Sequence, residues 1–295
     1  MVNIGILHES PKPTWTSRQL IEAFTELGAR VHYMRVSRLS GVVGDRDVKV
    51  LYANRLLDLD AVVVRNLGFA ISTEQLLKRI SILQQLEEEG ILVVNSSRSL
   101  LIARDKYTSI RLLRKAGVPV PETIVTEDIN VAMRYMREWK VAVIKPLTGS
   151  LGLGSIRVDD PDLAYRIMRT LLSQNQPIYL QRYVEKPGRD IRVFTVGLKV
   201  IAAAYRIAPP GQWKTNVALG ARTEPAKVDE ELEDISIRVV KALGLEYAGI
   251  DIAESPRGYV VFEANAAPLW RGLMNATGVN PAKAIAKHVL GLIKR

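Results

Sequence analysis

The sequence has 295 residues, of which 47% are hydrophobic and 24% are charged, and this length allows two or three globular domains. Cysteine is absent, so disulfides, thiolate metal sites and cysteine nucleophiles are excluded. The net charge is +10 at pH 7, and residues 101–200 carry most of the excess, which indicates an anionic small molecule, a nucleic acid or simply a solvated basic surface.

Membrane and nucleic-acid partners are not expected. No apolar run approaches the ~20 residues that span a bilayer, and the first ten residues, MVNIGILHES, lack the basic region and cleavage site of a signal peptide. A cytoplasmic protein is therefore expected. Aromatic residues make up only 6% of the chain and no run of five Lys or Arg occurs, so a specific nucleic-acid partner is not expected either.

The first hundred residues predict alternating strands and helices. The first helix begins near Thr16 or Ser17, either of which would be its N-cap, and it stops at Gly28; the second follows Ser72 and ends at Gly90. Apolar strands are expected at 2–7, 31–36, 60–67 and 91–95. This order predicts an α/β domain with a small, open, parallel sheet over residues 1–98.

The remaining residues predict a different, α+β construction with antiparallel strands. One helix is expected at 97–117, and a strand, a glycine loop and a second strand follow at 141–158. A hairpin turning at Gly197 and Leu198 and a second hairpin turning at 255–258 are separated by a helix at 231–244. We divide this part into a central subdomain, 99–184, and a C-terminal subdomain, 185–295.

The glycine loop TGSLGLGS, residues 148–155, lacks the Gly-Lys-Ser/Thr of a Walker A loop, and it leads into a strand instead of the helix of a Rossmann turn. It is either a plain turn or a mobile hairpin whose N–H groups close over phosphates. Lys145 lies three residues before the loop, at the end of a strand, from which its side chain could reach the same phosphates.

A polar face is predicted on the last two strands. Asp251 lies in the first of them, and Glu263 and Asn265, two residues apart, lie in the second on one face. Pairing about the short turn at 255–258 places Asp251 near Glu263. Oxygen ligands without His or Cys suit Mg²⁺ held together with substrate phosphates. The alternative is a solvent-facing edge hairpin, which the apolar flanks of these residues disfavour.

Two further segments have alternative interpretations. His8 to Ser10 follow the first strand, at the edge where open sheets bind ligands, so they form either a plain loop or a substrate contact. Residues 270–272, Trp-Arg-Gly, follow the polar strand, from which they either face the substrate or do not.

These motifs together resemble the ATP-grasp ligases, and the RimK-like branch fits best. The resemblance runs from about residue 100 to the end, whereas the first domain agrees only in its pattern of elements. The matching motifs are, in order, Asp105-Lys106, Lys145-Pro146 before GSLGLG, GRDIRVF at 188–194, Asn216, Asp251, and Glu263-Ala264-Asn265 with Pro268.

The resemblance implies a role for each matching position. The ATP phosphates would be held by two lysines and by the glycine loop, namely Lys106, Lys145, Gly149, Ser150, Gly152 and Gly154. Adenine would be held by the backbone of a hinge, Gln181, Arg182, Tyr183 and Val184. Further residues near the nucleotide would be Asp190, Lys214, Thr215 and Asn216. Two Mg²⁺ ions, for which Mn²⁺ could substitute, would be held by Asp251, Glu263 and Asn265. Arg192 and Arg206 would be catalytic, meeting the transferring phosphoryl group and the acyl phosphate.

The implied reaction is ATP-dependent amide formation, which relies on positioning and charge neutralisation and needs no nucleophilic side chain. The implied partners are ATP, L-glutamate or a related amino acid, and an anionic carboxylate acceptor; a homo-oligomer is compatible. After Asn216 the segment VALGARTEP lacks the stretch typical of branches that modify proteins, and APLWRGL is similar to archaeal tetrahydromethanopterin:glutamate ligases. The alternatives are a ligase for a protein tail or carrier protein, and a basic nucleotide- or nucleic-acid-binding module.

Overall fold

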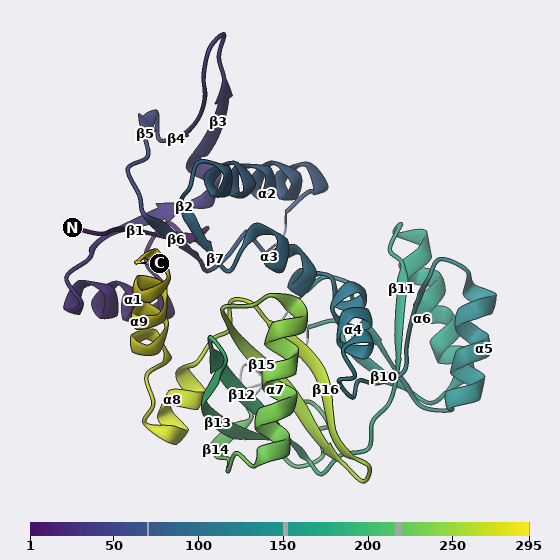
Figure 1. Cartoon of the computed structure of the whole chain (residues 1–295). Coiled ribbons are helices and arrows are strands. Elements are labelled where there is room, and N and C mark those ends of the chain that lie inside the picture. Colours follow the sequence, from purple (N-terminus) through teal and green to yellow (C-terminus); the bar gives the residue numbers. More distant parts are fainter. Residues whose placement is uncertain (70, 150–152, 216–219, 295) are drawn as a thin grey trace.

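The computed structural model describes residues 1–69, 71–149, 153–215 and 220–294 (Figure 1). The predicted parallel sheet is present at the N-terminus, with the strand order β2-β1-β6-β7. Its strands are β1 (Asn3–His8), β2 (Arg30–Arg35), β6 (Ala61–Val64) and β7 (Leu92–Val94). The helices that accompany it are α1 (Trp15–Glu26), α2 (Thr73–Glu88) and α3 (Ser97–Arg104).

A second, three-stranded antiparallel sheet projects from this domain and was not predicted (Figure 1). A 3₁₀ turn, η1 (Val36–Arg38), leads into it, and its strands are β3 (Leu39–Val43), β4 (Val48–Tyr52) and β5 (Arg55–Leu56). Its segments are short and rich in turn residues, such as the Gly44 to Asp47 stretch, so they give only weak strand signals in the sequence.

The start of α1 differs from the prediction. Its N-cap is Thr14, whose side chain accepts a hydrogen bond from the backbone N–H of Ser17. Thr16 and Ser17 lie inside the first turn and are buried. The prediction was wrong because Trp15, the first helical residue, is apolar and precedes both of the chosen caps. The predicted stop is confirmed, since Gly28 has the positive φ of +81° that ends many helices.

The helix expected at 97–117 is two helices that meet at Asp105. The first is α3, and the second is α4 (Lys106–Lys115). Asp105 is extended, with φ −88° and ψ 103°, and its side chain accepts hydrogen bonds from the N–H groups of Tyr107 and Thr108. An aspartate that caps a new helix competes with continuation of the old one, so the continuous apolar pattern was misleading. The break places Lys106 in the first turn of α4.

The central subdomain is an antiparallel sheet with the order β10-β9-β11-β8, covered on one side by two helices. Its strands are β8 (Thr123–Thr126), β9 (Ala142–Lys145), β10 (Ile156–Val158) and β11 (Ile178–Arg182), and its helices are α5 (Ile129–Trp139) and α6 (Pro161–Ser173). The prediction omitted β8 and α5. A separate small core, which includes Met136, Met168 and Leu180, holds the helices on the sheet.

The C-terminal subdomain is a five-stranded antiparallel sheet with the order β14-β13-β12-β15-β16. Its strands are β12 (Arg189–Val196), β13 (Lys199–Ile207), β14 (Arg222–Pro225), β15 (Tyr247–Ser255) and β16 (Gly258–Asn265). Its helices are α7 (Glu230–Leu243), α8 (Arg271–Thr277) and α9 (Pro281–Ile293). The parallel sheet followed by antiparallel sheets with helices confirms the predicted fold class.

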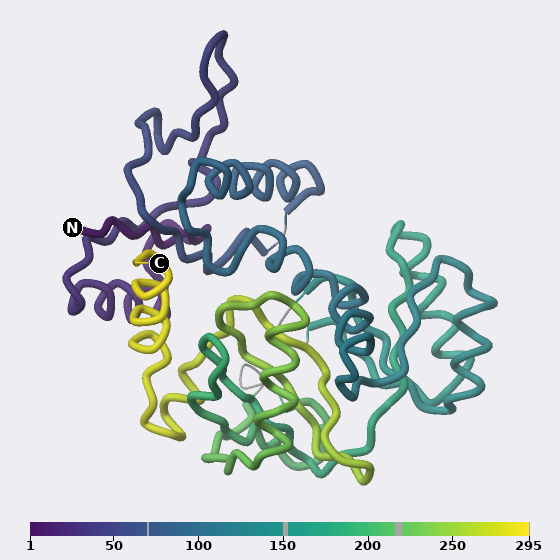
Figure 2. Tube along the Cα trace, viewed as in Figure 1, coloured from purple at the N-terminus to yellow at the C-terminus, as the bar shows by residue number. Residues whose placement is uncertain are grey.

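The last helix returns to the first. Helix α9 packs against α1, and both ends of the chain lie on the same side of the molecule (Figure 2). One apolar core includes Ile4 and Phe24 from the N-terminal domain together with Ile285 and Val289 from α9. Buried Asn95, just after β7, joins the same regions, because its side chain donates hydrogen bonds to the carbonyls of Tyr247 and Ala266.

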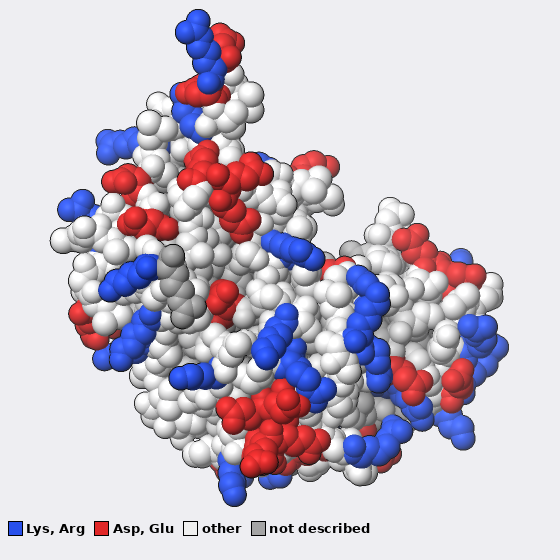
Figure 3. All heavy atoms as spheres, in the orientation of Figure 1, with Lys and Arg blue, Asp and Glu red and all other residues white. Residues whose placement is uncertain are grey.

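The surface in Figure 3 mixes acidic and basic side chains, with an acidic group over α7, whose first turn contains Glu230, Glu231 and Glu233. Within the described residues, no helix combines the length and the apolar character that crossing a bilayer requires.

Candidate active site

Asp251 and Glu263 lie near each other on β15 and β16, as predicted. Asp251 pairs directly with Glu263, and Gly249 pairs with Asn265. Nδ2 of Asn265 donates a hydrogen bond of 3.1 Å to Oε1 of Glu263. The pairing then shifts, and the next pair is Ile252 with Val261. This bulge explains why two consecutive residues, Phe262 and Glu263, both line the neighbouring pocket.

Asp251 is buried between two arginines. Its Oδ2 lies 2.9 Å from Nη2 of Arg206 and accepts a hydrogen bond of 3.1 Å from Nη2 of Arg192. Its Oδ1 lies 2.5 Å from Nε of Arg192, although this contact lacks hydrogen-bond alignment. Burial favours the neutral carboxyl, but the two guanidinium groups outweigh it, so the pKa of Asp251 is lowered and the group is an anion.

Arg206 also binds a second buried carboxylate. Its Nε and Nη2 donate hydrogen bonds of 2.7 and 2.8 Å to the two oxygens of Asp190. Thr215 donates its hydroxyl to the same carboxylate. These residues come from β12, β13 and the segment after β13. The predicted nucleotide-side residues Asp190 and Thr215 are therefore joined to the predicted catalytic Arg206.

The two predicted phosphate lysines approach the site from different elements. Lys145, the last residue of β9, donates a hydrogen bond of 2.6 Å to the side chain of Gln181. Burial, partly offset by the charge of Glu263, lowers the pKa of Lys145 to about 8. Lys106, at the start of α4, donates to the carbonyl of Gly149 at 2.9 Å, and burial lowers its pKa as well. Both ammonium groups are poorly solvated, and an anion would stabilise their charge.

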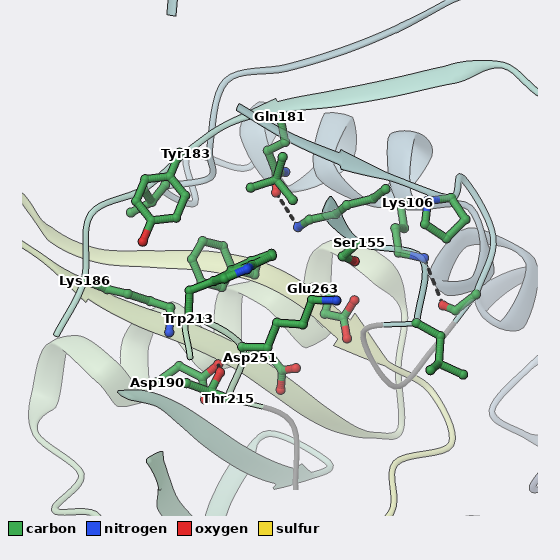
Figure 4. A pocket seen from close by; sticks show the side chains of 18 of the residues that line it. Lys106, Ser155, Gln181, Tyr183, Lys186, Asp190, Trp213, Thr215, Asp251 and Glu263 are labelled. Carbon is green, nitrogen blue, oxygen red and sulfur yellow. Dashed lines mark hydrogen bonds between the residues drawn. The ribbon is translucent and has the colours of Figure 1, made fainter. Parts of the chain in front are cut away.

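A pocket of about 860 Å³ collects these groups (Figure 4). Its walls are the end of β9 and the glycine loop on one side, the segment after β11 on another, and the polar face of β15 and β16 below. Most of the predicted nucleotide residues line it, together with both carboxylates of the polar face and one of the two arginines predicted to be catalytic: Lys106, Lys145, Gly149, Gln181, Arg182, Tyr183, Val184, Asp190, Lys214, Thr215, Asp251, Glu263 and Arg206.

Several residues that line the pocket were not among the predicted site residues. Lys186 lies two residues beyond the predicted hinge, and burial lowers its pKa. Trp213 and Phe262 supply flat apolar walls, and Ser155 ends the glycine loop. The clearest available signal was the position of Trp213, which immediately precedes the predicted Lys214.

Some predicted residues lie elsewhere. Ser150, Gly152 and Asn216 are outside the described residues. Within the described part of the chain, Gly154, Arg192 and Asn265 do not line this pocket. Arg192 and Asn265 line an adjoining pocket instead.

The adjoining pocket, of about 1450 Å³, lies between the N-terminal domain and the segment after β16. It shares Arg206 and Glu263 with the first pocket. Four arginines and one acid line the part of it that the structure describes: Arg65, Arg192, Arg206, Arg271 and Glu263. His8 and Arg271 both line this pocket. A substrate contact was one of the two alternatives for each of their segments. Trp270, in contrast, is buried in the core.

The residues of the polar face fit a hard cation. Glu263 and Asn265 are half-buried, their oxygens come from adjacent positions on one face, and Asp251 is an anion beside them. Among the residues described, no cluster of three or more His, Cys, Asp or Glu side chains is placed to hold a metal. Two carboxylates and one amide alone leave coordination positions that phosphate oxygens or water would fill.

Family profiles match nearly the whole chain. The RimK PreATP-grasp domain matches residues 2–100, and the RimK-like ATP-grasp domain matches residues 103–289. The tetrahydromethanopterin:alpha-L-glutamate ligase of Methanosarcina acetivorans is 33% identical, and the match covers 99% of this chain and 100% of the relative. The alpha-aminoadipate–LysW ligase LysX of Sulfurisphaera tokodaii is 32% identical, and that match covers 99% of each chain.

Solved structures share the fold. The ATP-grasp ligase PsnB, in a complex with a precursor variant, Mg and ADP, superposes with a TM-score of 0.78 at 24% identity, covering 98% of each chain. A RimK domain ATP-grasp protein from Sphaerobacter thermophilus has a TM-score of 0.76 at 23% identity, covering 98% of this chain and 100% of that one. The fold is thus that of an ATP-grasp ligase. The chain belongs to the RimK-like ATP-grasp family.

Proposed function

We propose that this ligase joins L-glutamate to a small acceptor that ends in a carboxylate, such as a pterin or another glutamate-tailed cofactor. The observation that carries the proposal is the junction of two basic pockets at Arg206 and Glu263. The first pocket contains poorly solvated lysines suited to phosphates, and the second contains arginines suited to carboxylates. A reaction between a nucleotide and an acidic substrate belongs at the place where the two pockets meet.

In this proposal the first pocket holds ATP. Residues 181–184 hold adenine, with Trp213 and Phe262 as apolar walls, and Lys106 and Lys145 hold the phosphates. Asp251, Glu263 and Asn265 would hold two Mg²⁺ ions, for which Mn²⁺ could substitute. When bound, the metal would neutralise part of the charge of the phosphates. The loop at 148–155 acts as the lid. The same proposal divides the chain into an N-terminal domain that ends at residue 98, a central subdomain that ends at residue 184, and a C-terminal subdomain.

The chemistry proceeds in two displacements. An acceptor carboxylate oxygen attacks the γ-phosphorus, the bond to ADP breaks, and an acyl phosphate forms. The amine of the amino acid then attacks the acyl carbon, phosphate leaves, and the amine loses a proton as the amide forms. Arg192 and Arg206 offset the charge that accumulates near the acyl phosphate. Exclusion of water by the loop protects this intermediate from hydrolysis.

The test is ADP release by the whole protein with ATP, Mg²⁺ and a glutamate-tailed acceptor, while the added amino acid is varied. L-Glutamate should give the highest rate. Preference for aminoadipate, lysine or D-alanine would contradict the proposed amino acid. The relatives include a ligase named for the protein LysW, and some similar structures contain precursor peptides, so protein substrates form the second arm. Activity only on a protein tail would contradict the proposed acceptor.

A further inference from the structure

We propose that the second pocket binds the side-chain carboxylate of the incoming amino acid through Arg65 and His8, with Arg271 closing the exposed side. This inference rests on the proposed function and deepens it, because it assigns the residues that select a dicarboxylic amino acid. His8 ends β1 and Arg65 follows β6 in the N-terminal domain, whereas Arg271 begins α8, so the selecting pocket is built across the boundary between the two halves of the chain.

Arg65 is a buried cation that has no acid beside it. Only 5% of its surface is exposed, and it stacks over the ring of Trp270 at 4.7 Å. Its Nη1 donates 3.1 Å to the hydroxyl of Tyr247, and its Nη2 donates 2.6 Å to the carbonyl of Pro268. Nη2 also donates 3.4 Å to the carbonyl of Ala267, so the partners of Arg65 within the described residues are neutral, and its Nε has no hydrogen-bond partner. A buried guanidinium without a counter-ion is costly, so an anionic ligand is the missing partner.

The orientation of His8 makes it a second donor. Its Nδ1 accepts a hydrogen bond of 2.8 Å from the backbone N–H of Ser10, so in the neutral ring the proton is on Nε2. Burial and the neighbouring Arg65 lower the pKa of His8 and favour this neutral form. Since His8 lines the pocket, Nε2–H supplies a donor beside Arg65.

Two of the other three arginines that line the described part of the pocket are already paired. Arg192 and Arg206 bind Asp251, and Arg206 binds Asp190 as well. Arg271 is exposed and stacks only over the ring of Trp15, at 5.3 Å, among the described residues. The cations left for a ligand are therefore Arg65 and Arg271, together with the His8 donor.

The place where the amide forms determines how the incoming amino acid is oriented in the second pocket. Its amine must reach the end of the pocket that is shared with the nucleotide pocket, at Arg206 and Glu263. The α-carboxylate is attached to the same carbon as the amine and stays near that end. The side-chain carboxylate extends away from it, toward the N-terminal domain, where Arg65 and His8 lie. A neutral side chain would leave Arg65 without an anion, which is the basis for rejection of glutamine.

The experiment compares L-glutamate with L-glutamine as the amine substrate, using kcat/KM for each. Arg65→Met and His8→Leu should raise the KM for glutamate by about 10- to 100-fold and reduce the preference for glutamate over glutamine by at least about tenfold. Arg271→Gln should have a smaller effect in the same direction. The KM for ATP should be unchanged in all three variants. His8→Gln, which retains an N–H donor, should recover most of the loss caused by His8→Leu.

Arg18→Met is the matched control, because it removes one exposed arginine of the same domain, on α1, and should leave the preference unchanged. Because Arg65 contacts Tyr247 and Trp270, the folding of Arg65→Met is checked by far-UV circular dichroism and by its affinity for Mg-ADP. If that variant does not fold, His8→Leu and Arg271→Gln decide the question. Glutamate-dependent ligation with an unchanged preference in the folded variants would overturn this inference alone. A parent protein that prefers a neutral amino acid would overturn the proposed amino acid too.

Discussion

Arg206 lies between two buried carboxylates, with Nη2 2.9 Å from Oδ2 of Asp251 and 2.8 Å from Oδ2 of Asp190. The exposed fractions of these three residues are 6%, 4% and 3%, so none of the charges is well solvated. Each carboxylate is predicted to contact a different part of the nucleotide complex. The guanidinium of Arg206 therefore fixes the position of Asp251, a proposed metal ligand, relative to Asp190, which is predicted to lie near the nucleotide.

Arg206→Met should destabilise the protein and abolish ligation. It leaves two buried carboxylates with fewer partners, and removal of one partner from a buried ion pair costs roughly 3–5 kcal/mol. The measurement is the urea midpoint, with and without Mg²⁺. Because Asp251 then keeps Arg192 but loses Arg206, a cation can take the lost position, and Mg²⁺ should raise the midpoint more in the variant than in the parent. Arg222→Met on β14 is the control, since Arg222 pairs with Glu224 in solvent and its side chain is 72% exposed. Equal midpoints for the two variants would contradict the argument.

Glu263→Ala should abolish Mg²⁺-dependent turnover and leave the fold intact. The side chain is half-buried at the edge of the core, so its removal takes away a metal ligand without creating a large cavity. We expect a loss on the order of 100-fold or more, beyond the 10- to 100-fold typical of residues that only support a ligand. Asn265→Ala should be milder, because it removes a neutral ligand. ADP release is measured against Mg²⁺ concentration; near-normal turnover of Glu263→Ala would show that the metal assignment is wrong.

ATP binding should weaken as the pH rises above about 8. The pKa of Lys145 is lowered to about 8 by burial, so the free protein loses this positive charge near that pH. Bound phosphates favour the charged ammonium and raise its pKa, so ATP binding at pH 8.5 should be accompanied by proton uptake. Calorimetry in buffers of different ionisation enthalpy measures the uptake. Lys145→Met should weaken ATP binding and remove most of the uptake, whereas exposed Lys199→Met should do neither. Binding of equal affinity in Lys145→Met would refute the phosphate contact.

Gly154→Val should uncouple ATP hydrolysis from amide formation. Gly154 has a φ of +75°, which β-branched residues rarely adopt, and an added Cβ would lie 3.4 Å from the Pro146 ring. The strain should disturb closure of the glycine loop and expose the acyl phosphate to water. The measured quantity is the ratio of ADP released to amide formed, which should rise. Gly90→Val introduces similar strain, at φ +84°, on the surface after α2, and its ratio should match the parent. A parent-like ratio in Gly154→Val would count against the lid.

The local parts of the site were predictable from the sequence. The four-residue turn at 255–258 sets the register of β15 and β16 and brings Asp251 close to Glu263, and the bulge after Asp251 then places the two residues directly opposite each other. Lys145 stood out because it ends a strand just before the glycine loop, whereas Lys106 and the hinge were predicted only from the resemblance to the ATP-grasp ligases. Phe262 was not predicted, because regular alternation along a strand places it on the face opposite to Glu263. It lines the pocket because a bulge shifts the register.

The long-range parts could not be predicted in the same way. Periodicity shows that Arg192 and Arg206 lie on strands, but their pairing with Asp251 depends on the order of β13, β12 and β15 in the sheet. Arg65 looked like the polar end of an apolar strand, and its role as a cation without a counter-ion depends on residues some 200 positions away. The break at Asp105 was missed because the apolar pattern continues through it, and the cap competes only locally.

The packing of α9 on α1 has a consequence for the order of events during synthesis. The core around Ile4 and Phe24 lacks Ile285 and Val289 until the end of the chain has left the ribosome. At a synthesis rate of ~5–20 residues per second, the N-terminal strands wait for tens of seconds with an apolar face uncovered. In a nascent chain halted before Pro281, α1 should therefore be accessible to protease and should bind a chaperone. Once α9 has left the ribosome, both the protease sensitivity and the chaperone binding should disappear. The N-terminal domain is made first and finished last.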